Sequence, residues 1–323
     1  MIIEIVEFDD DRLEAAASLV AARYGTELEQ EPLLSRRYQH AAETIPFLHD
    51  LRNEGPGVAA LEDGRLIGFI LGMVSMFKGV YTAYVPDFGH GTDTLKSRNV
   101  YRDMYAQLAA RWVGSGCFTH NISIMAHHRQ AIDAFHSLGF GMINIDALRD
   151  FSPGPDLPPK IEVRRAGRRD LEVLMSPETK LKRHLASSPI FIPSLPNPEM
   201  QRSVEEQLLD SDQPIWIASH EGAPVGFIVT ESTGRGPVLA RSDGGILSLV
   251  GAFVEPGARS LGVGSALLNT ALEWGRSSDY NVCVVDFESA NIEATRFWQG
   301  AGFRLVIYSL SRRLDDRIAW AKD

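Results

Sequence analysis

The sequence has 323 residues, 44% of them hydrophobic and 23% charged, a composition typical of a soluble globular protein with room for two domains. Its net charge of −10 argues against nucleic acid or an anionic membrane surface as the main partner. No apolar run is long enough to span a bilayer, and the acidic N-terminal residues lack the pattern of a secretory signal. We therefore expect a cytoplasmic protein in which Cys117 and Cys283 are buried thiols.

Two regions of the chain repeat the same order of sequence features. Ile67–Ser75 (IGFILGMVS) and Val225–Ser232 (VGFIVTES) each follow a turn signal and are each typical of the second strand of a hairpin. Ala131–Gly141 and Ala294–Arg304 both have helical periodicity and a Gly-Phe pair near their ends, where the glycine suits a helix C-cap. The pattern indicates an internal duplication of about 160 residues rather than a short-period repeat.

A linker composition separates the two copies. Residues 151–160 (FSPGPDLPPK) contain four prolines and a glycine. We therefore predict a first domain at 1–150, a linker at 151–160 and a second domain at 161–323.

The order of elements predicts the fold class. Each half reads as a strand, one or two helices, an antiparallel hairpin, and then alternating strands and helices, which favours an α/β fold with a mixed, mostly antiparallel sheet flanked by helices. In the second half we expect strands at 161–165, 215–219, 226–231, 246–254, 281–287 and 304–311, and helices within 168–209 and at 261–276 and 291–301.

The stretch Val254–Leu268 (VEPGARSLGVGSALL) places two glycines at the start of an expected helix. The apolar face of this helix is expected to carry the leucines at 261, 267, 268 and 272. Glycines in a first helical turn leave backbone N–H groups uncovered, and with the helix dipole they form an anion site. Arg259 adds charged donors beside it, so a pyrophosphate is the expected occupant.

Two other phosphate motifs fit this stretch badly. A dinucleotide fingerprint needs a third glycine three residues after Gly264, where Leu267 stands. The Walker pattern fails because no G-K-[S/T] follows. A nucleotide-dependent oxidoreductase therefore stays only as a distant alternative.

The stretch resembles the acyl-CoA loop, V-x-P-x-x-[QR]-x-x-G-x-[GA], of the GNAT superfamily of N-acetyltransferases. Asn291–Phe303 (NIEATRFWQGAGF) is similar to the second motif of that family, and Ile161–Leu174 to its first strand and helix. The resemblance covers residues 161–311. Together with the internal duplication, it implies two GNAT-like domains in tandem. It further implies acetyl-CoA as cosubstrate, an acyltransferase activity on an amine, and no metal.

The resemblance also implies roles for individual residues. The main chain of Phe253 and Val254 would pair with the pantetheine arm. Asn291 would contact the cofactor across the gap between the fourth and fifth strands, although it could instead be only a helix N-cap. The pyrophosphate would be wrapped by Arg259, Ser260, Leu261, Gly262, Val263, Gly264 and Ser265.

Catalysis by direct attack needs a neutral amine, a donor for the developing oxyanion and an exit for the thiolate. The family's acid is a tyrosine in the second motif, but Trp298 stands there. We expect Trp298 to contact the cofactor, but an indole N–H is too weak an acid. Either the thiolate leaves unprotonated, or Tyr308 or Ser289 supplies the proton, or the site binds acyl-CoA without brisk transfer. Glu231 and Asp286 are the candidate bases.

The first half lacks the glycine loop. Asn99, Val100, Tyr101 and Arg102 replace the glycines, and His128 stands at the position of Asn291. We expect a degenerate GNAT-like domain that does not bind CoA. The adjacent His127 and His128 do not converge on one face, so no zinc site is expected there.

The sequence thus predicts a cytoplasmic tandem GNAT N-acetyltransferase whose acceptor is a primary amine on a small molecule. The alternative is a non-catalytic acyl-CoA sensor or interaction module. Neither nucleic acid nor membrane is expected as a partner, and a homodimer is compatible with the sequence.

Overall fold

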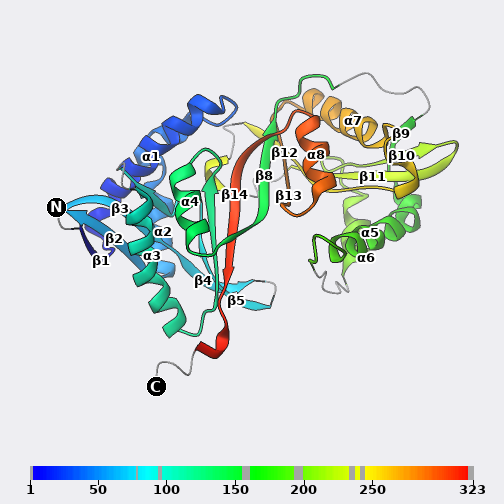
Figure 1. Cartoon of the computed structure of the whole chain (residues 1–323). Helices are drawn as coiled ribbons and strands as arrows, with labels where there is room; N and C mark the ends of the chain where they lie inside the picture. The colour runs from blue at the N-terminus through cyan, green and yellow to red at the C-terminus, as the bar shows by residue number, and fades with distance from the viewer. Residues whose placement is uncertain are drawn as a thin grey trace. The chain divides into compact units, whose positions relative to one another are not determined.

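The computed structural model of the chain describes residues 3–77, 79–93, 97–154, 161–192, 199–232, 237–240 and 244–318, so residues 155–160 of the expected linker lie outside it. The chain forms two compact units (Figure 1). Unit 1 contains residues 1–145, 236–243 and 305–323, and unit 2 contains residues 146–235 and 244–304. Within the described part of the chain, no helix combines the length and hydropathy that a membrane span requires.

The strands of unit 1 form two hydrogen-bonded groups. The first, in the order β1-β2-β3-β6, is antiparallel throughout. In the second, β5 and β7 are parallel, whereas β4 pairs antiparallel with β5 and β14 with β7. The bounds are β1 Ile3–Glu7, β2 Gly57–Glu62, β3 Arg65–Leu71, β4 Met73–Phe77, β5 Val80–Val85, β6 His90–Thr92, β7 Thr119–Met125, β8 Gly141–Arg149 and β14 Arg304–Arg313.

Helices cover both faces of the first strand group in unit 1. A Cβ at Gly68 of β3 would meet Val100 and Met104 of α3, while a Cβ at Gly91 of β6 would meet Leu19 of α1. Because side chains alternate along a strand, α1 and α3 pack on opposite faces. The helix bounds are α1 Leu13–Gln30, α2 Ile45–Glu54, α3 Ser97–Gly114 and α4 Arg129–Ser137.

The last strand of the chain completes unit 1. β14 pairs with β7 from Ile307↔Met125 to Arg313↔Thr119, and Ile307 and Leu310 are fully buried. Conversely, the end of β8 from Asp146 onward belongs to unit 2, where the Arg149 guanidinium donates to the carbonyl oxygens of Ala301 and Ser152. The compact units therefore differ from the predicted repeats, because residues 305–323 belong to the second repeat in the sequence but to unit 1 in the structure.

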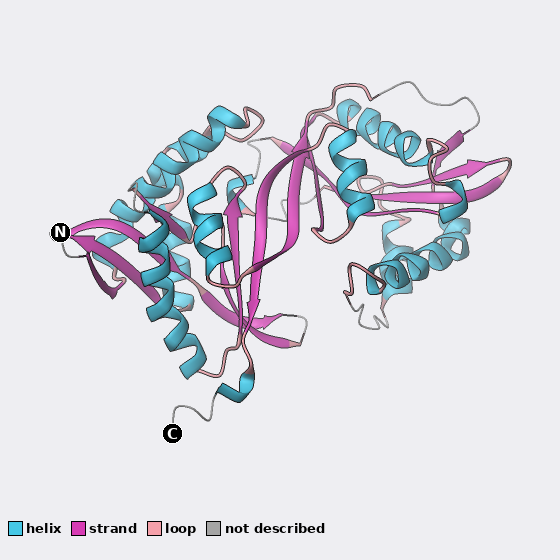
Figure 2. Ribbon diagram, in the orientation of Figure 1, coloured by secondary structure: helices cyan, strands magenta, loops and turns pink. Residues whose placement is uncertain are grey.

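Unit 2 contains a five-stranded array in the order β13-β12-β11-β10-β9. Among the described strands of this array, β12 and β13 pair in parallel and the other neighbours pair antiparallel. Helix α7 lies on one face of these strands and helices α5 and α6 lie on the other (Figures 1 and 2). The bounds are β9 Ile161–Arg165, α5 Leu171–Ala186, α6 Met200–Gln207, β10 Ile215–His220, β11 Ala223–Glu231, β12 Gly245–Val254, α7 Val263–Ser277, β13 Tyr280–Glu288 and α8 Ile292–Gly300.

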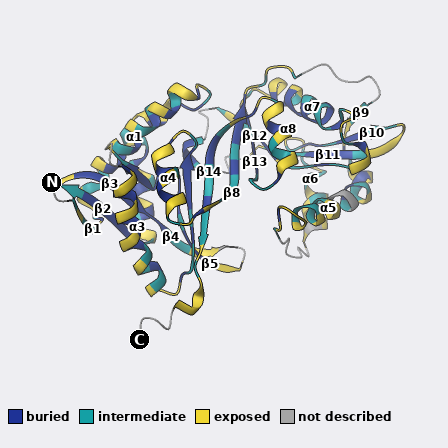
Figure 3. Cartoon of the chain, in the orientation of Figure 1, coloured by how far each residue is buried: buried dark blue, intermediate teal, exposed yellow. Residues whose placement is uncertain are grey.

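The hydrophobic sequence pattern explains how the helices pack. Alternate residues of β10 and β11, Ile215, Ile217 and Phe227, are buried with Leu174 of α5, and α7 buries Leu267, Leu268 and Leu272. Figure 3 shows the strands largely buried and the outer helix faces exposed. The predicted fold class, a mixed and mostly antiparallel sheet flanked by helices, is confirmed.

One expected helix start is wrong. The helix predicted from residue 261 begins at Val263, because Gly262 adopts a left-handed conformation (φ 87°) as its N-cap. Leu261 therefore lies outside the helix and is 44% exposed, rather than part of the apolar face.

Candidate functional site

The parallel strands β12 and β13 separate along their length. In the described strands their pairing runs from Gly245↔Tyr280 to Leu249↔Val285 and stops there, although β12 continues to Val254. At the same place the register between β11 and β12 shifts, and Val250 is the extra residue of a β-bulge. A bulge bends its strand, so the end of β12 turns away from β13 and a gap opens between them.

The hydrogen-bond pattern shows which main-chain groups face this gap. The Glu255 N–H donates to the Val225 carbonyl at 2.9 Å. Facing residues of an antiparallel pair alternate between bonded and non-bonded pairs. The main chain of Phe253 therefore bonds to β11 and, contrary to expectation, does not face the gap. Ala252 and Val254 direct their N–H and C=O groups the other way. The Val254 carbonyl indeed accepts from Arg259 Nε at 3.3 Å.

The glycine loop leaves the first turn of α7 open. Ser260 and Gly262 both have positive φ, 65° and 87°, and the first helical bond runs from the Ala266 N–H to the Gly262 carbonyl at 2.9 Å. The N–H groups of residues 263–265 precede that bond and have no partner within the helix. Since the N-cap residue is glycine, it has no side chain to cap them.

Gly264 has a packing role as well. A Cβ at this position would lie 3.0 Å from Cε2 of Phe297, so the glycine lets the Phe297 ring of α8 pack closely against the first turn of α7. The first turn of α7 is thereby in contact with the middle of α8.

Asn291 begins α8. Its side-chain Oδ1 accepts a hydrogen bond from the Ala294 N–H at 3.1 Å, and the residue is buried. The N-cap role of Asn291 is therefore confirmed, and its contact with the cofactor stays a prediction. Because capping uses the oxygen, the NH₂ group is the end of this side chain that remains for a ligand to meet.

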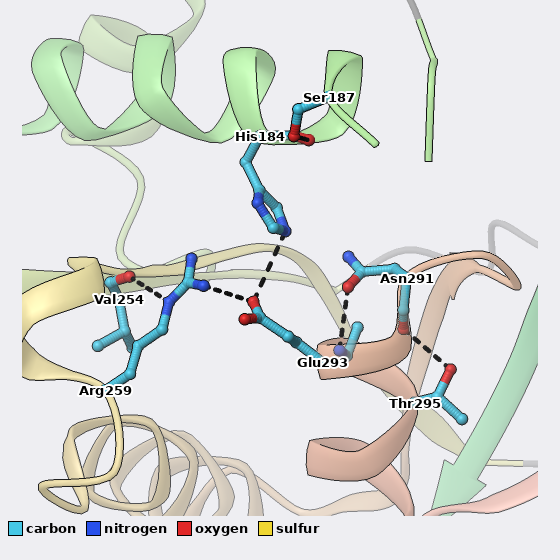
Figure 4. Close-up of polar contacts among 8 residues, drawn as sticks. His184, Ser187, Val254, Arg259, Asn291, Glu293 and Thr295 are labelled. Atoms are coloured by element: carbon cyan, nitrogen blue, oxygen red, sulfur yellow. Dashed lines mark hydrogen bonds and ion pairs between the residues drawn. The ribbon is translucent and has the colours of Figure 1, made fainter. Parts of the chain in front are cut away.

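Three charged or titratable side chains meet beside the loop, as Figure 4 shows. The Arg259 guanidinium forms an ion pair with Glu293 in the first turn of α8. His184 of α5 directs its Nε2 toward the same carboxylate at 3.9 Å. These contacts join α5, the loop and α8 at one point.

A cavity of about 510 Å³ lies at the centre of these elements. It is bordered by α5, the paired ends of β11 and β12, the glycine loop with the start of α7, and the start of α8. All the predicted cofactor residues except Leu261 line it: Phe253, Val254, Arg259, Ser260, Gly262, Val263, Gly264, Ser265, Asn291 and Trp298.

Residues 184–303, which contain most of this cavity, match the model of the Acetyltransferase (GNAT) family. The chain carries a GNAT-family domain. Among curated proteins none matches the sequence.

Solved structures resemble nearly the whole chain. A GCN5-related N-acetyltransferase from Sphaerobacter thermophilus is 15% identical, with a TM-score of 0.58 over 96% of this chain and 95% of that one. The glucosamine N-acetyltransferase region of a fungal multi-domain GH3 β-N-acetylglucosaminidase is 12% identical, with a TM-score of 0.54 over 96% of this chain and 38% of that chain. At these identities the likeness shows the fold, which extends over both halves of the sequence.

The sequence analysis missed several residues that line the cavity. Among them are Leu181 and His184 of α5 and Glu293 and Phe297 of α8. The two α8 residues lie inside the second motif, so their helical spacing from Asn291 could have indicated them. No local sequence pattern indicates that Leu181 and His184 of α5 line the cavity.

The predicted catalytic residues lie outside the cavity lining. Glu231 ends β11 opposite Ser248, and Asp286 is an exposed residue of β13. Tyr308 belongs to β14 in unit 1, opposite Ile124, and burial raises the pKa of its phenol.

In unit 1 the corresponding region is filled by side chains. The Nδ1 of His90 is 2.9 Å from the Tyr101 hydroxyl, and its Nε2 is 3.1 Å from the Ser123 carbonyl of β7. The His128 ring stacks on His90 with ring centroids 6.0 Å apart. His90, Tyr101 and His128 are all buried, and they occupy the space between β6, β7 and the start of α3.

Proposed function

We propose that the protein is an N-acetyltransferase that transfers an acetyl group from acetyl-CoA to a primary amine of a small molecule, by direct attack in a ternary complex. The observation that carries this proposal is the convergence, on one cavity, of a glycine-opened helix and the diverging main chain of β12. The match of residues 184–303 to the GNAT family model supports the acetyl transfer; the acceptor and the order of events are our inference.

The cavity suits both ends of the cofactor. The free N–H groups at the start of α7, together with the helix dipole and the Arg259 guanidinium, favour a pyrophosphate. The gap-facing main-chain groups of Ala252 and the N–H of Val254 match an extended arm that carries amide groups, because such an arm can pair with a strand as another strand does. Asn291 would contact the cofactor through its NH₂ group from the α8 side.

The chemical step makes definite demands on these residues. The amine nitrogen bonds to the thioester carbonyl carbon, the carbon–sulfur bond breaks, the amine loses a proton and sulfur leaves as a thiolate. A main-chain N–H of β12 that faces the gap supplies the donor for the developing oxyanion. Water or a carboxylate such as Glu231 or Asp286 takes the amine proton, and the thiolate leaves unprotonated and takes its proton from solvent.

We propose that only the second repeat, at 161–323, binds acetyl-CoA and that the first, at 1–150, is a degenerate copy. The buried His90–Tyr101 pair supports this, because it occupies the region that corresponds to the loop and gap of the GNAT domain. We further propose a cytoplasmic location, for which the buried free thiols Cys117 and Cys283 are the support.

A second function is favoured by one observation. Trp298 lines the cavity and is buried between Phe297 and Phe303, with ring centroids 4.8 Å and 5.2 Å away, so the motif's acid position holds a packed apolar side chain. A protein that binds acyl-CoA without turnover would have no use for an acid there.

Thiol release from acetyl-CoA in the presence of a panel of amines separates the two functions. The proposal expects amine-dependent thiol release and an acetylated product detected by mass spectrometry. Tight CoA binding without turnover on any amine would favour the non-catalytic binder. The matched control is the Gly262→Tyr variant, whose side chain enters the loop and which should lose both binding and turnover.

A further inference from the structure

One carboxylate side chain, that of Glu293, lines the cavity beside the glycine loop. Glu293 extends from the first turn of α8, lines the cavity and forms an ion pair with Arg259. The same carboxylate oxygen lies 3.9 Å from Nε2 of His184. The Glu293 carboxylate thus contacts both Arg259 and His184 beside the glycine loop (Figure 4).

Arg259 is held from two directions. Its Nε donates to the Val254 carbonyl at 3.3 Å, which fixes the guanidinium beside the loop, while its Nη1 is directed to Glu293. The Val254 contact does not involve Glu293, so it can persist when Glu293 departs. An incoming phosphate therefore meets the Arg259 guanidinium beside the loop, but this guanidinium is already paired with the Glu293 carboxylate.

We propose that Glu293 is a built-in competitor for the phosphate groups of the ligand: it occupies Arg259 in the free protein, gives way when the ligand binds, and thereby sets the affinity for pyrophosphate-bearing ligands. This inference rests on the proposed function of the loop as the phosphate site. It adds a residue that determines ligand affinity and that belongs to neither the glycine loop nor the strand.

The exposure of the partners makes the exchange feasible. The Glu293 side chain is 60% exposed and the Arg259 side chain 31% exposed, and a pair this exposed is worth a factor of about five or less in an equilibrium constant. A pyrophosphate carries more charge than one carboxylate and also meets the N–H groups of α7, so it outcompetes Glu293. The displaced carboxylate remains at the N-terminus of α8, where the helix dipole stabilises it.

The test compares wild type with Glu293→Gln by isothermal titration with four probes: CoA, dephospho-CoA, inorganic pyrophosphate and pantetheine. We expect tighter binding of the three pyrophosphate-bearing probes, by up to about fivefold, and unchanged binding of pantetheine, which has no phosphate. The gain should shrink at high salt because exposed charges are screened.

Two further variants sharpen the result. Glu206→Gln removes an equally exposed carboxylate that pairs with Arg202 on α6, outside the cavity lining, and should leave all four affinities unchanged. In an Arg259→Gln background, Glu293→Gln should give a smaller gain than in wild type, because the pair that it releases is already absent.

The outcomes distinguish this inference from the proposed function. If wild type and Glu293→Gln bind CoA equally well, or the variant binds more weakly, Glu293 is no competitor and the inference fails while the proposed function stands. If pantetheine gains as much as CoA, the effect is not directed at phosphate and the inference also fails. If neither protein binds CoA or pyrophosphate, the proposed function itself fails.

Discussion

The Oδ1 atom of Asn291 accepts the Ala294 N–H at 3.1 Å, so one side chain both caps α8 and borders the cavity. The two roles can be separated by substitution. Asn291→Ala removes the cap and should cost about 1 kcal/mol in the free energy of unfolding, together with a loss of CoA affinity. Asn291→Asp keeps a capping oxygen, and should keep the stability, but replaces the NH₂ donor with a negative charge near the phosphates.

Denaturant unfolding and CoA titration of both variants check this prediction. The expected pattern is a stable Asn291→Asp protein that binds CoA more weakly than wild type. Unchanged CoA binding by Asn291→Asp would show that Asn291 serves the helix alone.

The conformation of Gly262 leads to a second prediction. Gly262→Ala places a side chain at φ 87° and should cost about 1–2 kcal/mol of stability as well as weakening CoA binding, because the loop around the α7 N–H groups must shift. Gly222→Ala is the matched control: Gly222 has a similar φ of 80° with open space around it, in the turn between β10 and β11. Equal losses of CoA affinity in the two variants would mean that strain anywhere in the unit, rather than loop geometry, governs binding.

Trp298 supplies a third prediction. If the indole N–H plays no part in proton transfer, Trp298→Phe should change kcat for acetyl transfer by no more than about twofold, while the smaller ring costs roughly 1–3 kcal/mol of stability in a buried position. Steady-state kinetics at a temperature where the variant is folded provide the measurement. A tenfold or larger fall in kcat, with KM unchanged, would give the indole a role in the chemical step.

The buried histidines of unit 1 make its stability depend on pH. Burial lowers the pKa of His90 from 6.5 to about 4 and that of His120 also to about 4. Between these values the unfolded chain binds protons that the folded unit does not, so stability is fully present above about pH 6.5 and is lost as the pH falls toward 4. Each histidine contributes up to about 1.4 kcal/mol per pH unit within this window.

Urea midpoints at pH 7 and pH 5 measure the effect. His120→Gln should reduce the difference between the two midpoints, whereas His49→Gln, at an exposed position of α2, should leave it unchanged. A wild-type midpoint that does not fall between pH 7 and pH 5 would contradict the prediction.

Much of unit 2 could be predicted from the sequence because its signals are local. The glycines at 262 and 264, the arginine at 259 and the Asn291 cap lie within short stretches of chain, and the structure places all four on one cavity. The start of α7 differs by two residues from the expectation, because helical periodicity cannot show that Gly262 turns left-handed before the helix begins.

The rest depends on contacts between distant segments. No periodicity indicates that β14 pairs with β7 in unit 1, since an apolar strand is equally suited to either repeat. Likewise, His184 and Glu293 are 109 positions apart in the chain, and their approach at 3.9 Å follows only from the packing of α5 across the strands from which the loop extends. Glu231 and Asp286 are candidate bases because of their positions on strands. A strand position does not show whether a side chain reaches the cavity, and neither residue lines it.

The most direct test is a crystal structure of the protein with CoA bound, supported by the stoichiometry of CoA binding in solution. We expect one CoA per chain, with its pyrophosphate on the main-chain N–H groups of residues 263–265 and its pantetheine arm between β12 and β13. A ligand in unit 1 beside His90 and Tyr101, two bound molecules per chain, or a loop without ligand at saturating CoA would contradict the account.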